Sequence, residues 1–501
     1  MTSKRKSRHA PPKAGAMIEA LRGLGYTTAT AIADIIDNSI SAGASRVEVQ
    51  FDWVAQNSSI RILDNGIGMS DIELDMAMRL GDRNPLEQRA SHDLGRFGLG
   101  LKTASFSQCR RLTVASVKAG SLDCLRWDLD VLASSDDDGW HLMEGPAEGS
   151  EYQLDLLNNC SHGVLVIWEV LDRIVTQGFT EQDFLDHIDR IERHLAMVFH
   201  RFIGGLRPKL HIFINGQQVK PWDPFLADHP ATWSSPVERI YAEGGALEVQ
   251  CHVLPHKDRL SSDQHKSAEG PDGWTAQQGF YVYRNERMLV SGSWLGLGRG
   301  RSWTKEEAHR LARIRLDIPN TADAEWKIDI RKSSARPPVL VRERLTRLAE
   351  DTRARARRVF AHRGQPVRTG IGAPIIQAWH ALTHRDGVRY RIDRDHPAVR
   401  VVLDDAGLLE PQVRAMLRVI EETIPVQRIW LDTTEAKETP LTGFSKEPPA
   451  EVVSVLNVVY TNMVSRKGLS PEQARQQLLT TEPFNNYPEL VSGLPDTWPS
   501  K

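Results

Sequence analysis

Two residues four positions apart in AIADIIDNSISAGA, residues 31–44, could do chemistry together. On a helix, Asp34 and Asn38 share one face. The carboxylate could orient an attacking water, and the carboxamide oxygen could bind Mg²⁺. A plain polar stripe on an amphipathic helix is the alternative. Asp37 precedes Asn38 directly, but each helical step turns by about 100°, so it lies off that face.

A second motif, ILDNGIGM at residues 62–69, brings an aspartate into a tight turn. A strand delivers Asp64 to the turn, where Gly66 and Gly68 allow conformations and close approaches that a Cβ would block. A buried aspartate here can accept a hydrogen bond from an adenine amine. The alternative is an ordinary Asn-Gly turn.

A third motif, GRFGLGLKTAS at residues 95–105, is rich in glycine. Gly95, Gly98 and Gly100 would let backbone N–H groups wrap a triphosphate, and the following helix would add its N-terminal dipole. Lys102 would add charge. A flexible glycine-rich loop is the alternative, and the segment is not a Walker A motif.

The elements that must position these motifs form a mixed α/β pattern between about Gly15 and Arg173. Helices are expected over 18–41 and 70–80, with Ser70 as the N-cap of the second. Alternating apolar residues predict strands at 46–53, 59–63, 112–117, 122–129, 151–156 and 164–170. Strands on one side and helices on the other indicate a two-layer α/β sandwich.

The rest of the chain reads as two further regions. A long amphipathic helix at 180–203 opens the second, with strands at 209–214, 247–253, 279–284 and 312–317, a polar loop at 256–274 and a helix at 339–360. A linker is expected at Gly364–Pro374. The third is an α/β region with helices at 412–423 and 452–464. The expected domains are a basic tail at 1–14 and domains at 15–178, 179–365 and 366–501.

Composition bounds the function classes without choosing among them. The 501 residues carry 63 basic and 65 acidic side chains, a net charge of -2, which excludes coating nucleic acid or membrane by bulk charge alone. The four cysteines form no CxxC pair, so we expect reduced thiols. We find no secretory signal and no apolar run long enough to cross a bilayer, which predicts a cytoplasmic protein without a membrane partner.

In this order, the three motifs resemble the Bergerat-fold (GHKL) ATPases, which include gyrase-type topoisomerases, the large heat-shock chaperone, MutL-type mismatch-repair ATPases, histidine kinases and MORC ATPases. The resemblance implies that ATP and Mg²⁺ bind, with Asp34 as general base, Asn38 as the Mg²⁺ ligand, Asp64 at adenine, and 95–100 as a lid. The expected nucleotide-binding residues are Asn38, Asp64, Gly66, Gly68, Met69, Gly95, Arg96, Phe97, Gly98, Leu99, Gly100, Lys102 and Thr103.

Two residues depart from the family pattern. The base is normally Glu, and Asp34 is one methylene shorter, which reduces its reach by about 1.5 Å; a misplacement of about 1 Å can cost about 10²-fold in rate. Hydrolysis is therefore expected to be slow, unless the packing of the helix compensates for the shorter side chain. In HGVLVIWE, residues 162–169, Val164 stands where relatives have a Thr near adenine. Its side chain cannot donate a hydrogen bond.

The segments at 211–225 and 279–338 resemble the transducer domain of MutL- and MORC-type ATPases, a β-α domain like a ribosomal protein. This resemblance implies a lysine that contacts the γ-phosphate. Lys332 in DIRKSSARPP is the best match, and Lys327 is the alternative. A surface lysine at a strand end remains the other interpretation of Lys332. Histidine kinases lack this domain, which disfavours a kinase.

The resemblance implies an ATP-gated homodimeric clamp, and local charge favours DNA as its partner. Residues 331–363 are strongly basic and are opposed by Glu343, Glu350 and Asp351, although a solvated helix face is the alternative. The basic residues are Arg331, Lys332, Arg336, Arg342, Arg344, Arg347, Arg353, Arg355, Arg357, Arg358 and Arg363.

Two other functions stay open: a protein-remodelling chaperone like the heat-shock chaperone, and a scaffold that binds ATP with little hydrolysis. Bacterial MORC-like proteins are associated with antiphage gene clusters, so the resemblance also suggests a defence role with a nuclease or another defence protein as partner. The third domain, 366–501, carries no catalytic motif that we recognise.

Overall fold

A computed structural model describes residues 12–81, 100–134, 139–158, 160–242, 245–320, 325–328, 334–360, 376–384, 387–429 and 450–495. The chain divides into two compact units, one that ends at Ala356 and one that begins at Arg357. The expected linker at Gly364–Pro374 lies outside the described residues. No helix of the described segments is long and apolar enough to cross a bilayer.

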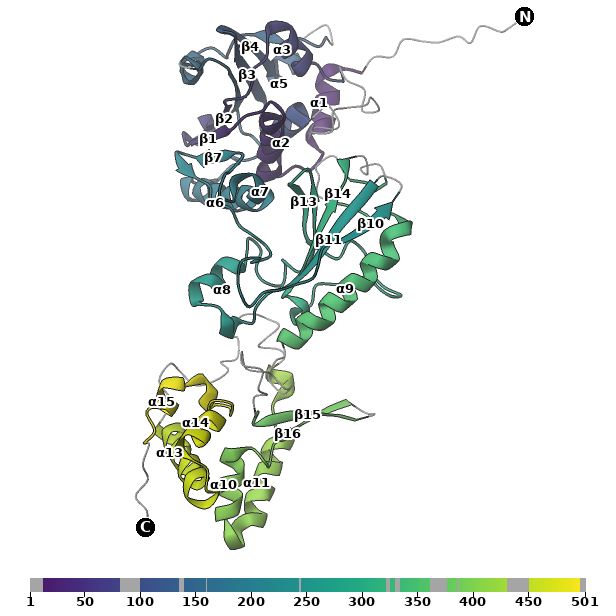
Figure 1. Ribbon diagram of the computed structural model, residues 1–501. Coiled ribbons are helices and arrows are strands. Elements are labelled where there is room, and N and C mark those ends of the chain that lie inside the picture. Colours follow the sequence, from purple (N-terminus) through teal and green to yellow (C-terminus); the bar gives the residue numbers. More distant parts are fainter. Residues whose placement is uncertain are drawn as a thin grey trace, which may run out of the picture. The chain divides into compact units, whose positions relative to one another are not determined.

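An eight-stranded mixed sheet, ordered β5-β4-β3-β6-β2-β1-β7-β8, underlies the first domain (Figure 1). Its strands pair antiparallel except β1 with β7, which run parallel. The strands are β1 (Arg46–Asp52), β2 (Ser59–Asp64), β3 (Arg111–Lys118), β4 (Ser121–Asp128), β5 (Met143–Glu144), β6 (Gly163–Glu169), β7 (His211–Ile214) and β8 (Gln217–Gln218).

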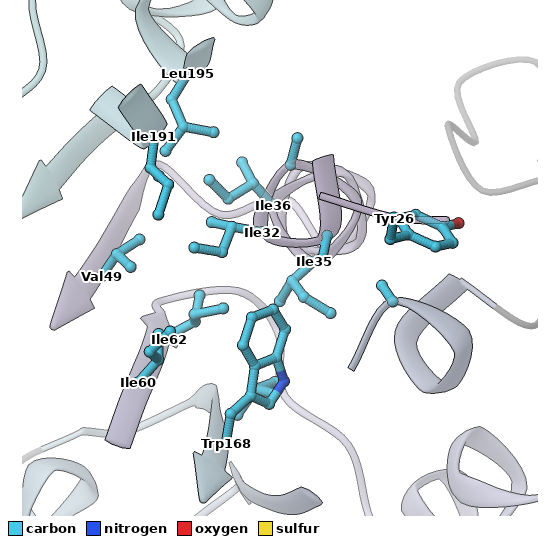
Figure 2. Close-up of a cluster of buried hydrophobic side chains, with 14 of the residues drawn as sticks. Tyr26, Ile32, Ile35, Ile36, Val49, Ile60, Ile62, Trp168, Ile191 and Leu195 are labelled. Atoms are coloured by element: carbon cyan, nitrogen blue, oxygen red, sulfur yellow. The ribbon is translucent and has the colours of Figure 1, made fainter. Parts of the chain in front are cut away.

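One face of this sheet is covered by helices. They are α1 (Ala14–Arg22), α2 (Thr28–Ser41), α3 (Asp71–Met78), α4 (Gly100–Phe106), α5 (Leu129–Ser134), α6 (Glu181–Val198) and α7 (His200–Ile203). Helix α2 is central: Ile32 and Ile36 point toward α6, while Ile35 lies over Trp168 of β6 (Figure 2). The predicted mixed α/β class with helices on a sheet is confirmed.

On the other face of the sheet, one predicted strand is a helix instead. The segment expected as a strand at 151–156 is a 3₁₀ helix, Glu151–Leu157. Leu154 and Leu157 are three positions apart, which is one turn of a 3₁₀ helix. Both pack with a second apolar cluster that includes Val117 and Leu165 of the sheet. The period of three, rather than two, decided this local structure.

A second sheet of six strands follows, ordered β10-β11-β14-β12-β13 with β9 beside β11. Every residue of β12 is buried, and α9 lies along this sheet (Figure 1). The elements are β9 (Trp233–Ser234), β10 (Glu238–Ala242), β11 (Gly245–Val253), α8 (Ser262–Ala268), β12 (Gly279–Arg284), β13 (Arg287–Ser293), β14 (Ala312–Ile318) and α9 (Val339–Phe360).

Two expectations for this second region differ from the structure. The strand expected at 209–214 as part of the second domain is β7, which extends the first sheet beside β1; α6 also packs into the first core through Ile191 and Leu195. The polar loop expected at 256–274 contains α8, which Ser261 and Gln264 cap reciprocally. Ser261 followed three positions later by Gln264 is the sequence pattern of such a capping box.

The second unit contains a two-stranded hairpin and a group of helices. A core around Leu456, Tyr460 and Leu478 holds most of these helices together, and it includes no residue of Glu410–Glu422. The elements are β15 (Trp379–His384), β16 (Gly387–Ile392), α10 (Pro397–Asp405), α11 (Glu410–Glu422), α13 (Ala450–Thr461), α14 (Pro471–Leu478) and α15 (Pro488–Ser492). The two helices expected in this region, at 412–423 and 452–464, correspond to α11 and α13.

Candidate nucleotide site

Helix α2 begins where its capping residues require. The Thr27 hydroxyl accepts a hydrogen bond from the Thr30 amide at 3.3 Å, and the Thr30 hydroxyl accepts one from the Thr27 amide at 3.0 Å. This reciprocal cap fixes the first turn of the helix. From there, Asp34 and Asn38 follow one turn apart on one face, as the sequence predicted.

Asp34 is buried although it carries a carboxylate, with 4% of its surface exposed. The Tyr26 hydroxyl donates a hydrogen bond to its Oδ2 atom at 2.8 Å. A Cβ placed on Gly100 would lie 3.8 Å from the same oxygen, so the carboxylate faces the first residue of α4. The structure therefore brings the first motif to the middle of the third, at Gly100.

Asn38 is exposed, unlike its neighbours Asp37 and Ser39. Mg²⁺ in phosphate-binding sites usually takes one or two protein oxygens, with substrate phosphates and waters completing the shell. An accessible carboxamide oxygen beside a buried carboxylate fits such a site. The described residues contain no cluster of three His, Cys, Asp or Glu side chains suited to a metal.

Asp64 ends β2 in a buried position and accepts hydrogen bonds from neutral groups. The Ser39 hydroxyl donates to Oδ2 at 2.7 Å, and the Gly66 amide donates to Oδ1 at 2.8 Å. Burial raises the pKa of the Asp64 carboxyl above its usual value, while these hydrogen bonds and one from the Val164 amide oppose the rise. Ser39 lies within the first motif, but we assigned it no role from the sequence.

Glycines around Asp64 are required by close backbone contacts. Gly68 has a φ of +68°, and a Cβ there would lie 2.1 Å from the Val117 carbonyl oxygen. Gly163 has a φ of +147°, and its Cβ would lie 2.3 Å from the Asp64 carbonyl oxygen. Any side chain at either position would push apart the strands that hold Asp64. Gly163 precedes Val164, which pairs with Asp64 across the sheet.

Two polar side chains that sequence reasoning missed hold the turn after Asp64. The Met69 amide donates to the Ser116 hydroxyl at 2.7 Å. His162 Nδ1 and the Gly66 carbonyl oxygen are 2.7 Å apart. Ser116 and His162 come from β3 and from the turn before β6. Neither has a local sequence signal, because each acts across the sheet.

Some of the predicted phosphate-binding residues lie outside the described residues, and others are buried in α4. Gly95, Arg96, Phe97, Gly98 and Leu99 lie outside the described residues. Thr103 is buried in α4. Lys102 is also buried, and its ammonium donates to the carbonyl oxygens of Ala77 at 2.8 Å and Arg79 at 2.6 Å, at the end of α3. In this structure, Lys102 holds α3 against α4.

The two candidate γ-phosphate lysines also differ. Lys332 lies outside the described residues. Lys327 is described and exposed, with a φ of +47°. It directly follows Trp326, which is fully buried.

Helix α9 carries most of the basic residues of 331–363, and not all of their side chains are free to contact phosphate. Arg353 is buried, with its guanidinium carbon 4.8 Å from the ring centroids of both Trp294 and Trp303. Arg355 lies 4.0 Å from the ring centroid of Trp233. Cation–π stacking of this kind uses the guanidinium for packing. Arg357 and Arg358 are exposed at the end of α9.

Comparison with known proteins finds a family match over part of the first sheet and its helices. Residues 26–163 match the family model described as histidine kinase-, DNA gyrase B-, and HSP90-like ATPase. Within this range, the chain resembles the GHKL ATPases. The matched range includes Asp34, Asn38 and Asp64, and it ends at the glycine that packs against Asp64.

Curated relatives extend the similarity beyond this domain. The chain is 25% identical over 278 residues to the DNA mismatch repair protein MutL of Shewanella piezotolerans, covering 52% of this chain and 38% of that protein. MutL of Tolumonas auensis is 27% identical over 280 residues, covering 52% and 40%. ATPase morc-1 of Caenorhabditis elegans is 29% identical over 96 residues, covering 19% and 11%. The chain thus spans about two fifths of the length of these MutL relatives.

Proposed function

We propose that the first domain binds ATP with Mg²⁺ and hydrolyses it slowly. The observation that carries the proposal is Asp64: a buried carboxylate surrounded by neutral donors, whose oxygens can accept one more hydrogen bond from an adenine amine. GTP carries a carbonyl at the corresponding position of its base, and two acceptors would face each other there. The site therefore favours ATP over GTP.

In this proposal, Asp34 orients the attacking water. Tyr26 fixes the carboxylate through a 2.8 Å hydrogen bond, and Gly100 leaves space in front of it. A base held in one rotamer can offset part of the reach that the shorter side chain loses, because positioning carries much of the rate. Mg²⁺ bound at Asn38 would supply charge neutralisation at the phosphates. Lys332 is proposed, on family resemblance alone, to contact the γ-phosphate.

Single-turnover hydrolysis tests the base. We expect Asp34→Asn to lower the rate about 10²-fold or more while ATP still binds, because general-base catalysis contributes about 10²–10⁴-fold. Asp34→Glu restores the usual family residue and is expected to retain or raise the rate. Asp189→Asn, on the exposed side of α6, is the matched control. An unchanged rate in Asp34→Asn would show that another group is the base.

We further propose that ATP gates a homodimeric clamp on DNA. The relatives that are named DNA mismatch repair proteins support this proposal over 52% of the chain, and the exposed arginines at the end of α9 offer phosphate contacts. Neutralising Arg353 and Arg355 would disturb packing, so the informative double variant is Arg357→Ala/Arg358→Ala. Each lost phosphate contact is expected to reduce the slope of log K against log salt by about 0.9.

The control for this DNA test is Arg344→Ala. The Arg344 side chain is already ion-paired with Glu238 at 2.6 Å, so its loss should leave the slope unchanged. Equal slopes for the double variant and the full-length wild type would remove α9 from the DNA surface. A dimer whose formation depends on ATP, measured with and without DNA, would separate the clamp from a scaffold that binds ATP without a cycle. A role in antiphage defence rests on family resemblance alone.

A further inference from the structure

A buried ion pair joins the second sheet to the helix that carries the proposed base and metal ligand. Arg287 is the first residue of β13, and its Nε lies 3.2 Å from Oδ1 of Asp37 on α2. Their side chains are 5% and 1% exposed. The two residues are 250 positions apart in the sequence, and this contact joins α2 to the second sheet within the first compact unit.

The surroundings of Arg287 leave Asp37 as its charged partner. Its Nη1 also donates to the Met288 carbonyl oxygen, and its guanidinium carbon lies 5.5 Å from the ring centroid of Phe199. Burial, with a smaller contribution from Arg287, lowers the pKa of His194 on α6 to about 4. His194 is therefore neutral near pH 7 and does not compete with Arg287 for Asp37.

The packing beside the Arg287–Asp37 ion pair is incomplete. A cavity of about 280 Å³ lies next to it, lined by Thr30 of α2, by His194, Met197 and Val198 of α6, and by Arg287–Ser293 of β13 together with Lys305. Side chains do not fill this space, so apolar contact between the start of α2 and β13 is interrupted there. The ion pair joins the two elements beside this space, and Met288 of β13 shares the apolar core with α2.

Helix geometry places Asp34 and Asn38 between two side chains of α2 that bind other parts of the protein, Asp37 and Ser39. At about 100° per residue, Asp37 lies about 60° to one side of Asp34, and Ser39 lies about 100° beyond Asn38 on the other. Ser39 ties α2 to Asp64 of the first sheet. Asp37 ties it to Arg287 of the second sheet. The rotation of α2, and with it the direction of Asp34 and Asn38, depends on both ties.

We propose that Arg287 is a positioning residue for ATP hydrolysis: through Asp37, it couples the position of the second sheet to the orientation of the catalytic helix. A displacement of β13, as would accompany binding or dimerisation at the second domain, would turn α2 and move the base relative to the water. The inference rests on the proposed hydrolysis. It adds a route by which events at the second domain can regulate that step.

The coupling predicts a rate effect distinct from a binding effect. A displacement of about 1 Å at the base can cost about 10²-fold, whereas adenine contacts at Asp64 do not involve Arg287. We expect Arg287→Lys to lower the single-turnover rate about 10-fold or more, because a lysine ammonium cannot reproduce the guanidinium fork. ATP affinity should stay within about 3-fold of wild type.

The experiment compares full-length wild type, Arg287→Lys, Arg287→Met and the double variant Asp37→Asn/Arg287→Met, with rate and ATP affinity measured for each. The double variant removes both charges of the Arg287–Asp37 pair, so it keeps the test open where Arg287→Met alone does not fold. Its folding can recover while its rate stays low, and a merely structural role does not predict that separation. Arg239→Met is the matched control, because Arg239 pairs with Glu248 within the second sheet and is 67% exposed.

The outcomes separate the two proposals. One outcome overturns the coupling and leaves the ATPase proposal standing. In it, the wild type hydrolyses ATP, and the rates of Arg287→Lys and of the folded double variant lie within about 3-fold of the wild-type rate. Wild type that binds ATP without hydrolysing it, or does not bind it, overturns the ATPase proposal and the coupling with it. A low rate with unchanged ATP affinity in both variants supports the coupling.

Discussion

Two buried carboxylates lie on or beside helix α2, and their surroundings differ. Asp37, at the boundary with the second sheet, is matched by the guanidinium of Arg287. Asp64, in the proposed adenine pocket, is matched by a hydroxyl and by backbone amides. A buried carboxylate paired with a cation has its charge satisfied inside the protein, whereas one held by neutral donors can still attract a donor from a ligand. The surroundings thus distinguish an internal tie from a binding group.

The largest effect is expected on the free energy of unfolding when the Arg287–Asp37 ion pair is broken. Arg287→Met removes one partner of a buried ion pair, so the free energy of unfolding should fall by about 3–5 kcal/mol. Urea-induced unfolding of the full chain, followed by tryptophan fluorescence, measures this change. Arg239→Met removes an exposed pair and should cost about 1 kcal/mol or less. A comparable small loss in both variants would erase the distinction between the two carboxylates.

The next effect is expected in the adenine pocket and on a different quantity. Asp64→Asn should weaken ATP binding by about 2–3 kcal/mol, or about 100-fold, because a charged acceptor is lost. Its free energy of unfolding should not fall at neutral pH, since the raised pKa of this carboxyl shows that burial disfavours its charge. Calorimetric ATP titration and urea unfolding test both parts. ATP affinity equal to that of the control Asp189→Asn would contradict the adenine assignment.

A smaller effect is expected from the hydroxyl that holds Asp64. Ser39→Ala should weaken ATP binding by about 1 kcal/mol, because one neutral hydrogen bond to the acceptor is lost. Ser41→Ala is the matched control on the same helix, where the hydroxyl donates to the Asp37 carbonyl oxygen instead. ATP titrations of both variants give the comparison. Equal affinities would show that Ser39 plays no part in presenting Asp64.

The smallest effect is a pH dependence of ATP affinity. Since the pKa of the Asp64 carboxyl is raised, the carboxylate should be protonated, and adenine binding weakened, at a higher pH than for an ordinary aspartate. The free energy of unfolding depends on pH in the opposite direction. The folded chain holds the Asp64 proton more tightly than the unfolded chain does, so protonation of Asp64 contributes stability below the unfolded pKa, and this contribution is lost as the pH rises through the folded pKa. In Ser39→Ala, the fall in affinity should move to higher pH. Affinity that stays flat down to about pH 4 would refute the shift.

Local sequence signals predicted the elements that carry the motifs, because helix periodicity, strand alternation and glycine turns act over a few residues. The pairing of Asp34 with Asn38 on one face and the strand that delivers Asp64 followed from such signals. Residues 151–157 did not, since short apolar runs fit two periods. The strand at 209–214 was predicted, but its place in the first sheet was not, because the parallel pairing of β7 with β1 is a contact across 165 positions, from Arg46 to His211.

The sequence by itself determined the residue types, their spacing and the family resemblance of the first domain, since chemistry and helix geometry are encoded locally. Tertiary structure decided which of those residues are available. It buried Lys102 against α3, stacked Arg353 between tryptophans and placed Ser39 on Asp64. It also joined Asp37 to Arg287, because burial and charge pairing depend on which distant segments meet, and a local pattern does not contain that information.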